Sequence, residues 1–166
     1  MNHPILITSD IHGDETGKNL IKKAMNHFMA DCIISAGDQC PDPYDPFYQT
    51  IIEVRGNCDR FYEYQNIPFP PLSREIEAFG RKICITHGHM LSDADFHLKD
   101  GDIFVSGHTH VPLLELRHGI YFVNPGSPSR PRSSAGPTAV LLDDACLTLF
   151  SLLDFSQISA LSFSCL

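Results

Sequence analysis

Polar side chains that can bind metal ions follow several apolar, β-rich runs of the sequence, each beside a glycine. The sets are Asp10-Ile11-His12-Gly13, Gly37-Asp38, Gly56-Asn57, His87-Gly88 and Gly107-His108-Thr109-His110. Four imidazoles, two carboxylates and one amide make a mixed nitrogen and oxygen donor set, which suits Mn, Fe, Co, Ni or Zn better than Ca or Mg. The sequence therefore predicts a transition-metal site that needs no cysteine, unlike most structural zinc sites.

The number of candidate ligands indicates two metal ions. Seven side chains are too many for one ion that keeps a position open, but they suit two ions if one carboxylate bridges them. Two ions about 3.5–4 Å apart form a clamp for in-line displacement at phosphorus, with a bridging hydroxide as the nucleophile. A lone Asp or Asn before glycine is usually a turn residue or helix cap. That interpretation gives no reason for four histidines at strand ends.

A parallel sheet in the first half of the chain is expected to position three of these sets. Pro4–Ser9 and Cys32–Ala36 are typical of buried strands, and residues 15–29 between them place apolar side chains at helical spacing. This order predicts a βαβ unit. Residues 41–50 are expected to form a loop with one helical turn, and Ile51–Arg55 a third strand. Loops beyond the carboxyl ends of such strands gather at one crevice, so the sets should converge. The i, i+2 pairs Asp10/His12 and His108/His110 would point to one side in extended backbone.

Hairpins dominate the prediction for the second half. The expected strand pairs are Arg74–Phe79 with Ile83–Thr86, Leu113–Arg117 with Ile120–Asn124, and Thr138–Leu142 with Ala145–Leu152. Ile103–Ser106 is a further buried strand, and Pro125–Pro137 a long surface loop. Residues 1–166 are expected to form one domain. The tail, Phe155–Leu166, has no charged side chain and is expected to pack on the domain or on a partner, including a second copy in a homo-oligomer.

Composition narrows the classes of partner. The 43% hydrophobic and 19% charged residues are ordinary for a globular protein. The formal charge of −8 argues against stable nucleic-acid binding. The six cysteines form no C-x-x-C pair, which favours free thiols in a reducing cytoplasm. With no signal-peptide pattern and no apolar run near the ~20 residues of a membrane span, we expect a cytoplasmic protein that does not associate with membranes.

The motifs together resemble a known family. Asp10-Ile11-His12, Gly37-Asp38, Gly56-Asn57-Cys58-Asp59, Thr86-His87-Gly88-His89 and Gly107-His108-Thr109-His110 resemble those of the calcineurin-like metallophosphoesterases. The small single-domain YfcE-like phosphodiesterases look most similar, over residues 5 to 150. Asn124-Pro125-Gly126-Ser127 also resembles a motif of that subgroup. The resemblance implies the α/β class, as a four-layer α/β/β/α sandwich with two mixed sheets.

The resemblance also implies a division of the ligands. Asp10, His12 and His110 would hold the first ion, and Asn57, His87 and His108 the second, with Asp38 bridging both. The first expectation for the metal is Mn, with Ni, Co, Fe and Zn as alternatives. Asp38, Asn57 and His108 would act in catalysis through the bridging hydroxide and the bound phosphate, and Asn57 would also contact substrate.

Five further residues are candidates near the site. Cys58 and Asp59 occupy the position where the wider family usually has a His and an acid, and a thiol is a weak replacement for imidazolium as proton donor. His89 follows a predicted ligand by two residues and is a candidate for touching substrate. Arg130 and Arg132 would meet an anionic substrate if their loop folds over the crevice.

The predicted function is therefore hydrolysis of a small phosphodiester at a binuclear metal centre. The same site could instead serve a phosphomonoesterase or nucleotide phosphatase. A protein of another class is the second alternative, because a retromer subunit with a similar fold serves as an interaction scaffold. Such a scaffold would be expected to lack a metal ligand, and none of the predicted ligands is missing here.

Overall fold

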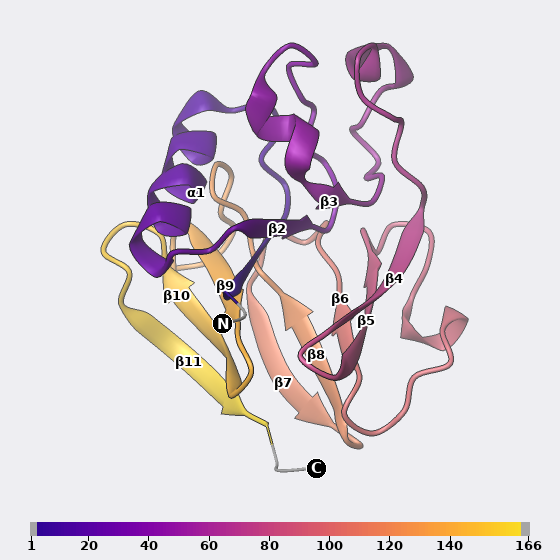
Figure 1. The fold of residues 1–166 in the computed structure, drawn as a ribbon, viewed down its shortest axis with the longest axis vertical. Coiled ribbons are helices and arrows are strands. Elements are labelled where there is room, and N and C mark those ends of the chain that lie inside the picture. The colour runs from indigo at the N-terminus through magenta and orange to yellow at the C-terminus, as the bar shows by residue number, and fades with distance from the viewer. Residues whose placement is uncertain (1–2, 164–166) are drawn as a thin grey trace.

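Two β-sheets form the centre of the molecule. The structure is a computed structural model that describes residues 3–163. The first sheet contains β1 (Ile5–Thr8), β2 (Cys32–Ser35), β3 (Ile52–Glu53), β9 (Thr138–Leu142), β10 (Cys146–Ser151) and β11 (Gln157–Ser162), in the order β11-β10-β9-β1-β2-β3. The second contains β4 (Ser73–Ala78), β5 (Arg81–Thr86), β6 (Ile103–Val105), β7 (Leu113–Arg117) and β8 (Ile120–Asn124), in the order β4-β5-β6-β8-β7. Figure 1 shows both sheets.

Both sheets are mixed, as expected. Strands β1, β2 and β3 are parallel neighbours, and so are β5, β6 and β8. The other pairings are antiparallel, and they include the three predicted hairpins. The parallel strands matter for the site, because their carboxyl ends lie at one edge of each sheet and lead into the loops that carry the polar sets.

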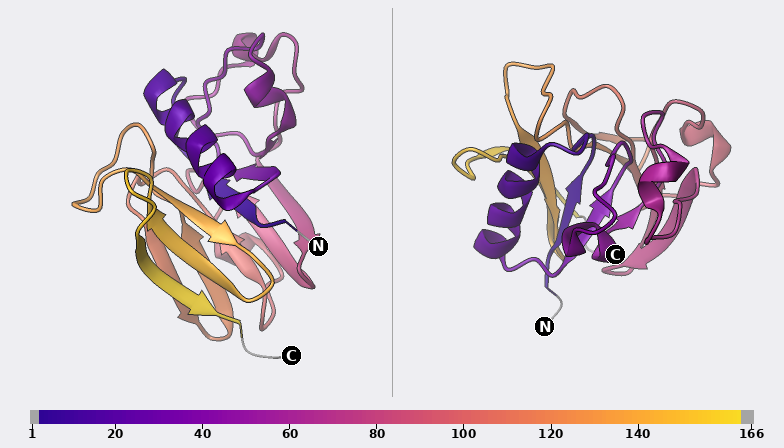
Figure 2. Two further views of the ribbon diagram at one scale, coloured as in Figure 1. Left: turned by 60° about the vertical axis from the view of Figure 1, so that its left-hand side comes forward. Right: turned by 90° about the horizontal axis from the view of Figure 1, so that it is seen from above.

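The alternation of side chains along the strands separates two apolar clusters. Ile7 and Ile34 face the second sheet and pack there with Ile85 and Val105. Leu6 and its neighbours face the other way, toward helix α1 (Glu15–Phe28). Successive side chains of a strand point to opposite faces of the sheet, so a single strand can contribute to both clusters. In Figure 2, α1 lies on one side of the first sheet and the second sheet on the other.

Helix α1 begins and ends where its sequence indicates. The Asp14 carboxylate caps the first turn by accepting a hydrogen bond from Gly17 N at 2.6 Å. Ile21 and Ala24 are buried on its apolar face. The helix stops at Met29, which adopts a left-handed conformation. None of the helices in residues 3–163 is long and apolar enough to cross a membrane.

The expected two-sheet sandwich is confirmed, with sparse helical layers. Besides α1, the described chain contains only the short 3₁₀ helices η1 (Pro46–Thr50), η2 (Phe61–Tyr64) and η3 (Asp93–Asp95). The segment with η3 covers the outer face of the second sheet through Phe96, whose ring packs 5.6 Å from that of Phe104. Asp and Ser compete with helical hydrogen bonding, which explains a turn rather than an α-helix in this segment.

Two details differ from the sequence prediction. The strand expected over Ile51–Arg55 is reduced to β3, because Arg55 N leaves the sheet and donates to Pro71 O at 2.7 Å. Helix η2 was not anticipated, whereas η1 is the helical turn expected within residues 41–50.

The tail is part of the first sheet as far as it is described. Strand β11 pairs antiparallel with β10, and Leu161 and Phe163 pack against the inter-sheet cluster. The Phe163 ring lies 5.1 Å from that of Tyr121 and 4.0 Å from the Arg81 guanidinium carbon. The predicted tail therefore packs on the domain up to Phe163, and residues 164–166 lie outside the described residues. The possible contact of the tail with a second copy stays a prediction.

We expect Phe163→Ala to lower the free energy of unfolding by about 2 kcal/mol, because a half-buried Phe loses roughly half of the ~3–5 kcal/mol measured at buried sites. Ile158→Ala, in the adjoining strand β11, is the matched control, since Ile158 is 45% exposed, and should cost under ~1 kcal/mol. Denaturant unfolding measures both. Equal effects would contradict the packing. The single-domain organisation of residues 1–166 stays a prediction, and it requires one cooperative transition in the same experiment.

Candidate metal centre

The predicted ligands come together at one end of the molecule. They lie in loops that follow β1, β2, β3, β5 and β6, at the upper edge of both sheets in Figure 1. The convergence expected from the strand ends therefore holds. The seven residues are Asp10, His12, Asp38, Asn57, His87, His108 and His110.

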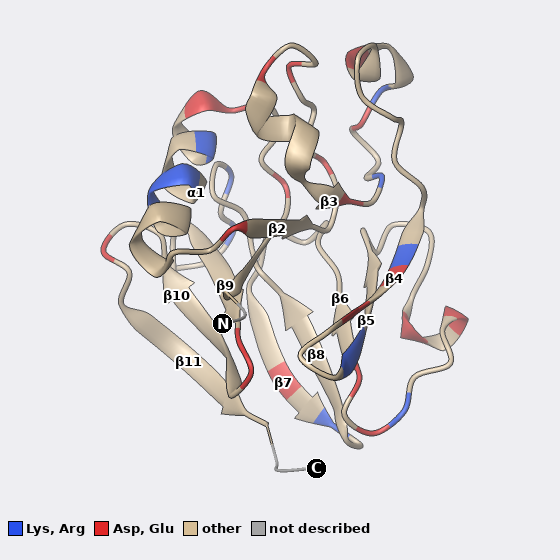
Figure 3. Ribbon diagram, viewed as in Figure 1, with Lys and Arg blue, Asp and Glu red and all other residues tan. Residues whose placement is uncertain are grey.

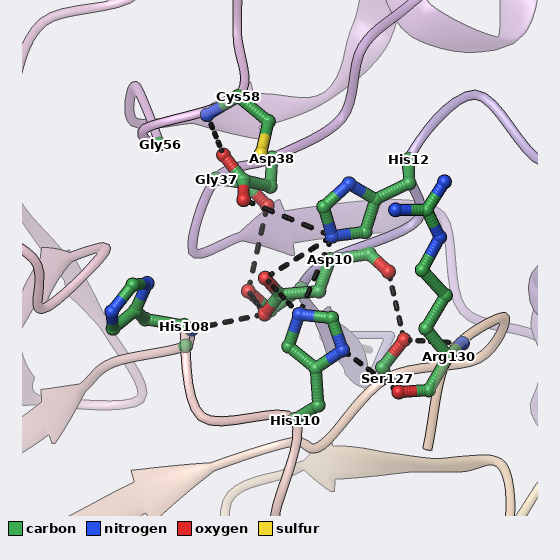
Figure 4. Close-up of polar contacts among 12 residues, drawn as sticks. Asp10, His12, Gly37, Asp38, Gly56, Cys58, His108, His110, Ser127 and Arg130 are labelled. Atoms are coloured by element: carbon green, nitrogen blue, oxygen red, sulfur yellow. Dashed lines mark hydrogen bonds and ion pairs between the residues drawn. The ribbon is translucent and has the colours of Figure 1, made fainter. Parts of the chain in front are cut away.

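The first group of donor atoms surrounds Asp10 Oδ1. This oxygen lies 3.2 Å from His110 Nε2 and 3.7 Å from His12 Nε2. The two ring nitrogens are 3.3 Å apart. Figure 4 shows both rings turned toward the carboxylates. Asp10, His12 and His110 could hold a metal ion with these atoms.

The second group lies on the other side of Asp38. His87 Nε2 is 3.4 Å from Asp38 Oδ2 and 3.1 Å from Asn57 Oδ1. Asn57 Oδ1 is also 3.0 Å from His108 Nδ1. Asp38 Oδ2 lies 3.8 Å from His12 Nε2 of the first group. The Asp38 carboxylate is therefore close to a histidine of each group, and Asp10 Oδ1, 3.9 Å from His87 Nε2, approaches the second group as well.

Backbone carbonyls orient two of the rings. His87 Nδ1 donates to Ala36 O and His110 Nδ1 donates to Arg130 O, each at 2.7 Å. A ring that donates through Nδ1 keeps the lone pair of Nε2 for another partner when it is neutral. Such outer hydrogen bonds are the usual support of metal-binding histidines. Both Nε2 atoms therefore face the cluster as potential ligands.

The two oxygens of the Asp10 carboxylate have different surroundings. Oδ2 accepts hydrogen bonds from Ser9 Oγ at 2.6 Å and from His108 N at 3.0 Å. Oδ1 is buried and has no hydrogen-bond partner among the described residues. A buried oxygen without a partner is costly unless a cation or proton satisfies it. This orphaned atom, facing imidazole nitrogens, fits a metal ion.

Burial and close contacts shift the pKa values of three groups in the cluster. Burial raises the pKa of Asp10. Burial alone would lower the pKa of His87, but the contact with Asp38 and the charge of Asp10 outweigh it and raise that pKa. Burial would likewise raise the pKa of Asp38, yet His87 and the Cys58 amide lower it. Asp10 and His87 therefore hold a proton more readily than usual, whereas Asp38 releases its proton more readily.

The backbone around the site is unusual. Asp10, His12, Asp38, His108 and His110 all have positive φ, between 53° and 69°. The extended backbone expected for the i, i+2 pairs is therefore wrong, although their convergence holds. Positive φ is uncommon for residues with a Cβ, but Asp, Asn and His tolerate it best. Such conformations persist where surrounding contacts enforce them, often at functional sites.

Two glycines permit the close approach of the loops. A Cβ on Gly56 would lie 2.0 Å from Asp38 Oδ1. One on Gly107 would lie 2.0 Å from Ser9 Oγ and 2.8 Å from Asp10 Oδ2. Any side chain at either position would displace a carboxylate of the cluster.

The Asp59 carboxylate holds the loops together by hydrogen bonds. Its Oδ2 accepts from Asp38 N and Gly56 N, and its Oδ1 from Cys40 N and the Tyr64 hydroxyl, at 2.8–2.9 Å. Both oxygens are therefore occupied by donors. Tyr64 comes from η2, the element that sequence reasoning did not anticipate.

Glu53 is a buried acid beneath this network. Burial and the negative charge of Asp59 raise the pKa of Glu53 to about 8. At pH values between the ordinary pKa of 4.5 and the raised pKa of about 8, Glu53 is ionised in the unfolded chain but keeps its proton in the folded chain. Stability from this group is thus complete below pH 4.5 and is lost as pH rises through about 8.

For metal-stripped protein, we expect the free energy of unfolding to fall between pH 5 and pH 8 by up to ~1 kcal/mol per pH unit because of Glu53. Glu53→Gln should flatten this dependence, because the amide does not titrate. Glu77→Gln, at an exposed position of β4, is the control and should leave the slope intact. Denaturant unfolding across this pH range measures the slopes. A slope unchanged in Glu53→Gln would refute the assignment.

Cys58 and His89 lie at the edge of the cluster. Cys58 Sγ is close enough to His12 and Asp38 to complete a possible three-residue metal group. Burial and the charge of Asp38 raise the pKa of Cys58, which keeps it a thiol. The His89 ring packs 5.3 Å from that of His87. Burial and the neighbouring histidines lower the pKa of His89, which keeps it neutral.

The loop between β8 and β9 reaches the site. Arg130 and Arg132 line the same cavity, of about 140 Å³, as most of the candidate ligands. Ser127 Oγ donates to Asp10 O at 2.8 Å, and Ser129 Oγ donates to Ile11 O at 2.8 Å. Asn124 Nδ2 donates to Gly107 O at 2.9 Å. The loop is therefore attached to both segments that carry the first group.

Sequence reasoning missed the supporting residues. Ser9, Tyr64 and Ser129 carried no recognisable signal, because a serine or tyrosine is common everywhere. Asn124 and Ser127 do carry a signal, because they belong to the Asn-Pro-Gly-Ser motif, but the motif alone does not reveal their role.

Comparison with known proteins identifies relatives of the whole chain. Residues 4–145 match the calcineurin-like phosphoesterase superfamily domain. Phosphodiesterase YfcE of Escherichia coli strain K12 is 27% identical over 175 aligned residues, which cover 93% of this chain and 95% of YfcE. A solved structure of YfcE, described as a phosphoesterase from E. coli, has a TM-score of 0.86 at 25% identity and covers 97% of this chain and 100% of that one. Vps29 of Entamoeba histolytica in complex with zinc has a TM-score of 0.68 at 21% identity, covering 97% and 99% of the two chains. The likeness to Vps29 shows the fold alone.

The fold and the cluster define a metal-dependent enzyme that hydrolyses phosphoester bonds. The chain belongs to the calcineurin-like phosphoesterase superfamily.

Proposed function

We propose that the chain is a phosphodiesterase with two divalent metal ions. Asp10, His12 and His110 would hold one ion, and Asn57, His87 and His108 the other, with Asp38 shared. The observation that carries this proposal is the position of Asp38 Oδ2, within 3.4 Å of His87 Nε2 and 3.8 Å of His12 Nε2. The name of the relative YfcE supports the choice of diesters.

The protein's own residues prepare the site for this chemistry. When bound, two divalent ions supply Lewis acidity toward the phosphoryl oxygens and lower the pKa of water. The carbonyls of Ala36 and Arg130 hold His87 and His110 in the orientation described above, and Ser9 holds Asp10. Asn57 is exposed at the mouth of the cavity, where its amide can also contact the substrate phosphate. Such preorganised polar groups stabilise developing charge without reorganisation.

The metal and the cellular location complete the proposal. A donor set of imidazole, carboxylate and amide supports Mn first, with Ni, Co, Fe or Zn as alternatives. The free thiols of Cys32, Cys40, Cys58, Cys84 and Cys146 support a reducing cytoplasm as the place of action.

Metal-stripped protein reconstituted with Mn, Ni, Co, Zn or Mg tests this function. We expect hydrolysis of bis(p-nitrophenyl) phosphate to exceed that of p-nitrophenyl phosphate, and Mg to support the least activity. Metal analysis and anomalous scattering at saturating Mn should find two sites. One site at saturation would reject the binuclear arrangement. Faster hydrolysis of the monoester would favour the phosphomonoesterase alternative, and no hydrolysis with any metal would favour the interaction scaffold.

A further inference from the structure

Two arginines share the cavity with the candidate metal ligands. Figure 4 shows the Arg130 side chain extending alongside His12, and both residues line the cavity. Arg132 lines the same cavity. Blue segments on the loop from β8 to β9 mark basic residues there in Figure 3.

Neither guanidinium has a partner within residues 3–163. Arg130 and Arg132 form no side-chain hydrogen bond and no ion pair there. The chain has 20 acidic residues against 12 basic ones, so carboxylates are not scarce, and Lys18 and Lys82 each contact two of them. Two unpaired cations beside a site for phosphoesters indicate a role in binding an anion.

The backbone of this segment is held in place. Ser127 Oγ accepts from Arg130 N at 2.9 Å while donating to Asp10 O, and Arg132 N donates to His110 O at 3.1 Å. Pro128 and Pro131 restrict φ on either side of Arg130. The arginines are therefore presented by a rigid segment attached to the metal-binding loops, which lowers the entropy cost of binding a ligand.

Charge and volume define what such a pair would bind. A phosphodiester carries a single negative charge, and the two ions of the proposed centre would already attract it. The cavity of about 140 Å³ is smaller than the ~300–1,000 Å³ typical of drug-sized ligands. It therefore accepts phosphoryl groups and leaves the organic part of the substrate outside. A guanidinium fork matches the oxygens of a phosphate.

We propose that Arg130 and Arg132 form a subsite for a second phosphate group, so that the preferred substrate is a phosphodiester that carries a phosphomonoester nearby. This inference rests on the proposed phosphodiesterase function and names its substrate class. The arginines bind and orient this second phosphate, and take no part in bond breaking.

Two matched esters test the subsite. Thymidine 5′-(p-nitrophenyl phosphate) and its 3′-phosphorylated form share the scissile diester and the leaving group. We expect kcat/KM for the 3′-phosphorylated ester to be at least ~10-fold higher on the metal-loaded protein, a modest effect for two charge-assisted contacts. The Arg130→Gln/Arg132→Gln double variant should lose this preference. Arg117→Gln is the control, because Arg117 is exposed on β7 and paired with Glu115. It should keep the preference.

A binding measurement separates failure of the subsite from failure of the proposed function. Thymidine 3′,5′-bisphosphate should bind the metal-loaded protein at least ~10-fold more tightly than thymidine 5′-phosphate in calorimetry, and the double variant should bind both alike. This preference would support the subsite even if neither ester were hydrolysed. Equal affinities in the unmodified protein, or a preference that survives in the double variant, would overturn it.

Discussion

We expect Asp38→Asn to lower kcat/KM for an aryl phosphodiester by about 10³-fold or more at saturating metal, more than any other single ligand substitution. The loss corresponds to about 4 kcal/mol of transition-state stabilisation. The physical reason is that Asp38 Oδ2 lies close to histidines of both groups of donor atoms, so in the proposed centre a neutral amide would weaken the binding of both ions at once. Asn retains an oxygen that can accept the 2.7 Å hydrogen bond from Cys58 N and tolerates the positive φ of this residue.

The comparison requires a variant that affects mainly one ion. His12→Asn is suitable, because His12 also has positive φ and belongs to the first group only. Metal content and thermal stability of both variants should be measured beside the kinetics. Equal losses in the two variants, with both sites occupied, would show that Asp38 is not shared.

A steep dependence on the leaving group is the second large effect. A positioned general acid usually contributes about 10²–10⁴-fold to the rate. Because this enzyme would lack one, we expect the rate to fall from aryl to alkyl phosphodiesters by about 10²–10⁴-fold more than it would in an enzyme that protonates the leaving oxygen. None of the three candidates for that acid is suitable. Cys58 is a thiol with a raised pKa, Asp59 has both oxygens occupied by donors, and the lowered pKa of His89 keeps it neutral.

Variants at these positions decide whether an acid is present. Cys58→Ser should change the rates by less than about threefold, because neither a thiol nor a hydroxyl is an effective acid at neutral pH. Cys58→His should raise the alkyl rates if the ring fits. A leaving-group series at fixed pH measures all three proteins. A flat series in the unmodified enzyme, with chemistry rate-limiting, would mean that another residue supplies the proton, and His89→Gln would then be the next variant.

Helices and strands could be predicted where neighbouring residues in the sequence carry the pattern of apolar and polar side chains. Helix α1 follows from apolar residues at helical spacing after the Asp14 cap, and the hairpin of β4 and β5 from alternation around Gly80. Strand β3 was overestimated because an apolar run does not reveal where the ladder ends. Strand β11 could not be identified, because its residues do not alternate cleanly: Ile158 and Ala160 are exposed, whereas Ser159 is partly buried. Its partner β10 is defined only by the fold.

The sequence by itself determined which donor atoms the site contains, since ligand chemistry belongs to the residue type and strand ends mark the loops. Only the tertiary structure decided how those atoms face one another. The contact of Ser127 with Asp10 joins residues 117 positions apart, and the 98 positions between Asp10 and His108 are bridged by a single hydrogen bond. The left-handed backbone of Asp10 and His110 is likewise visible only in the folded protein. No local pattern encodes such pairs, because they form when distant loops pack together and the free energy of that packing offsets the backbone strain.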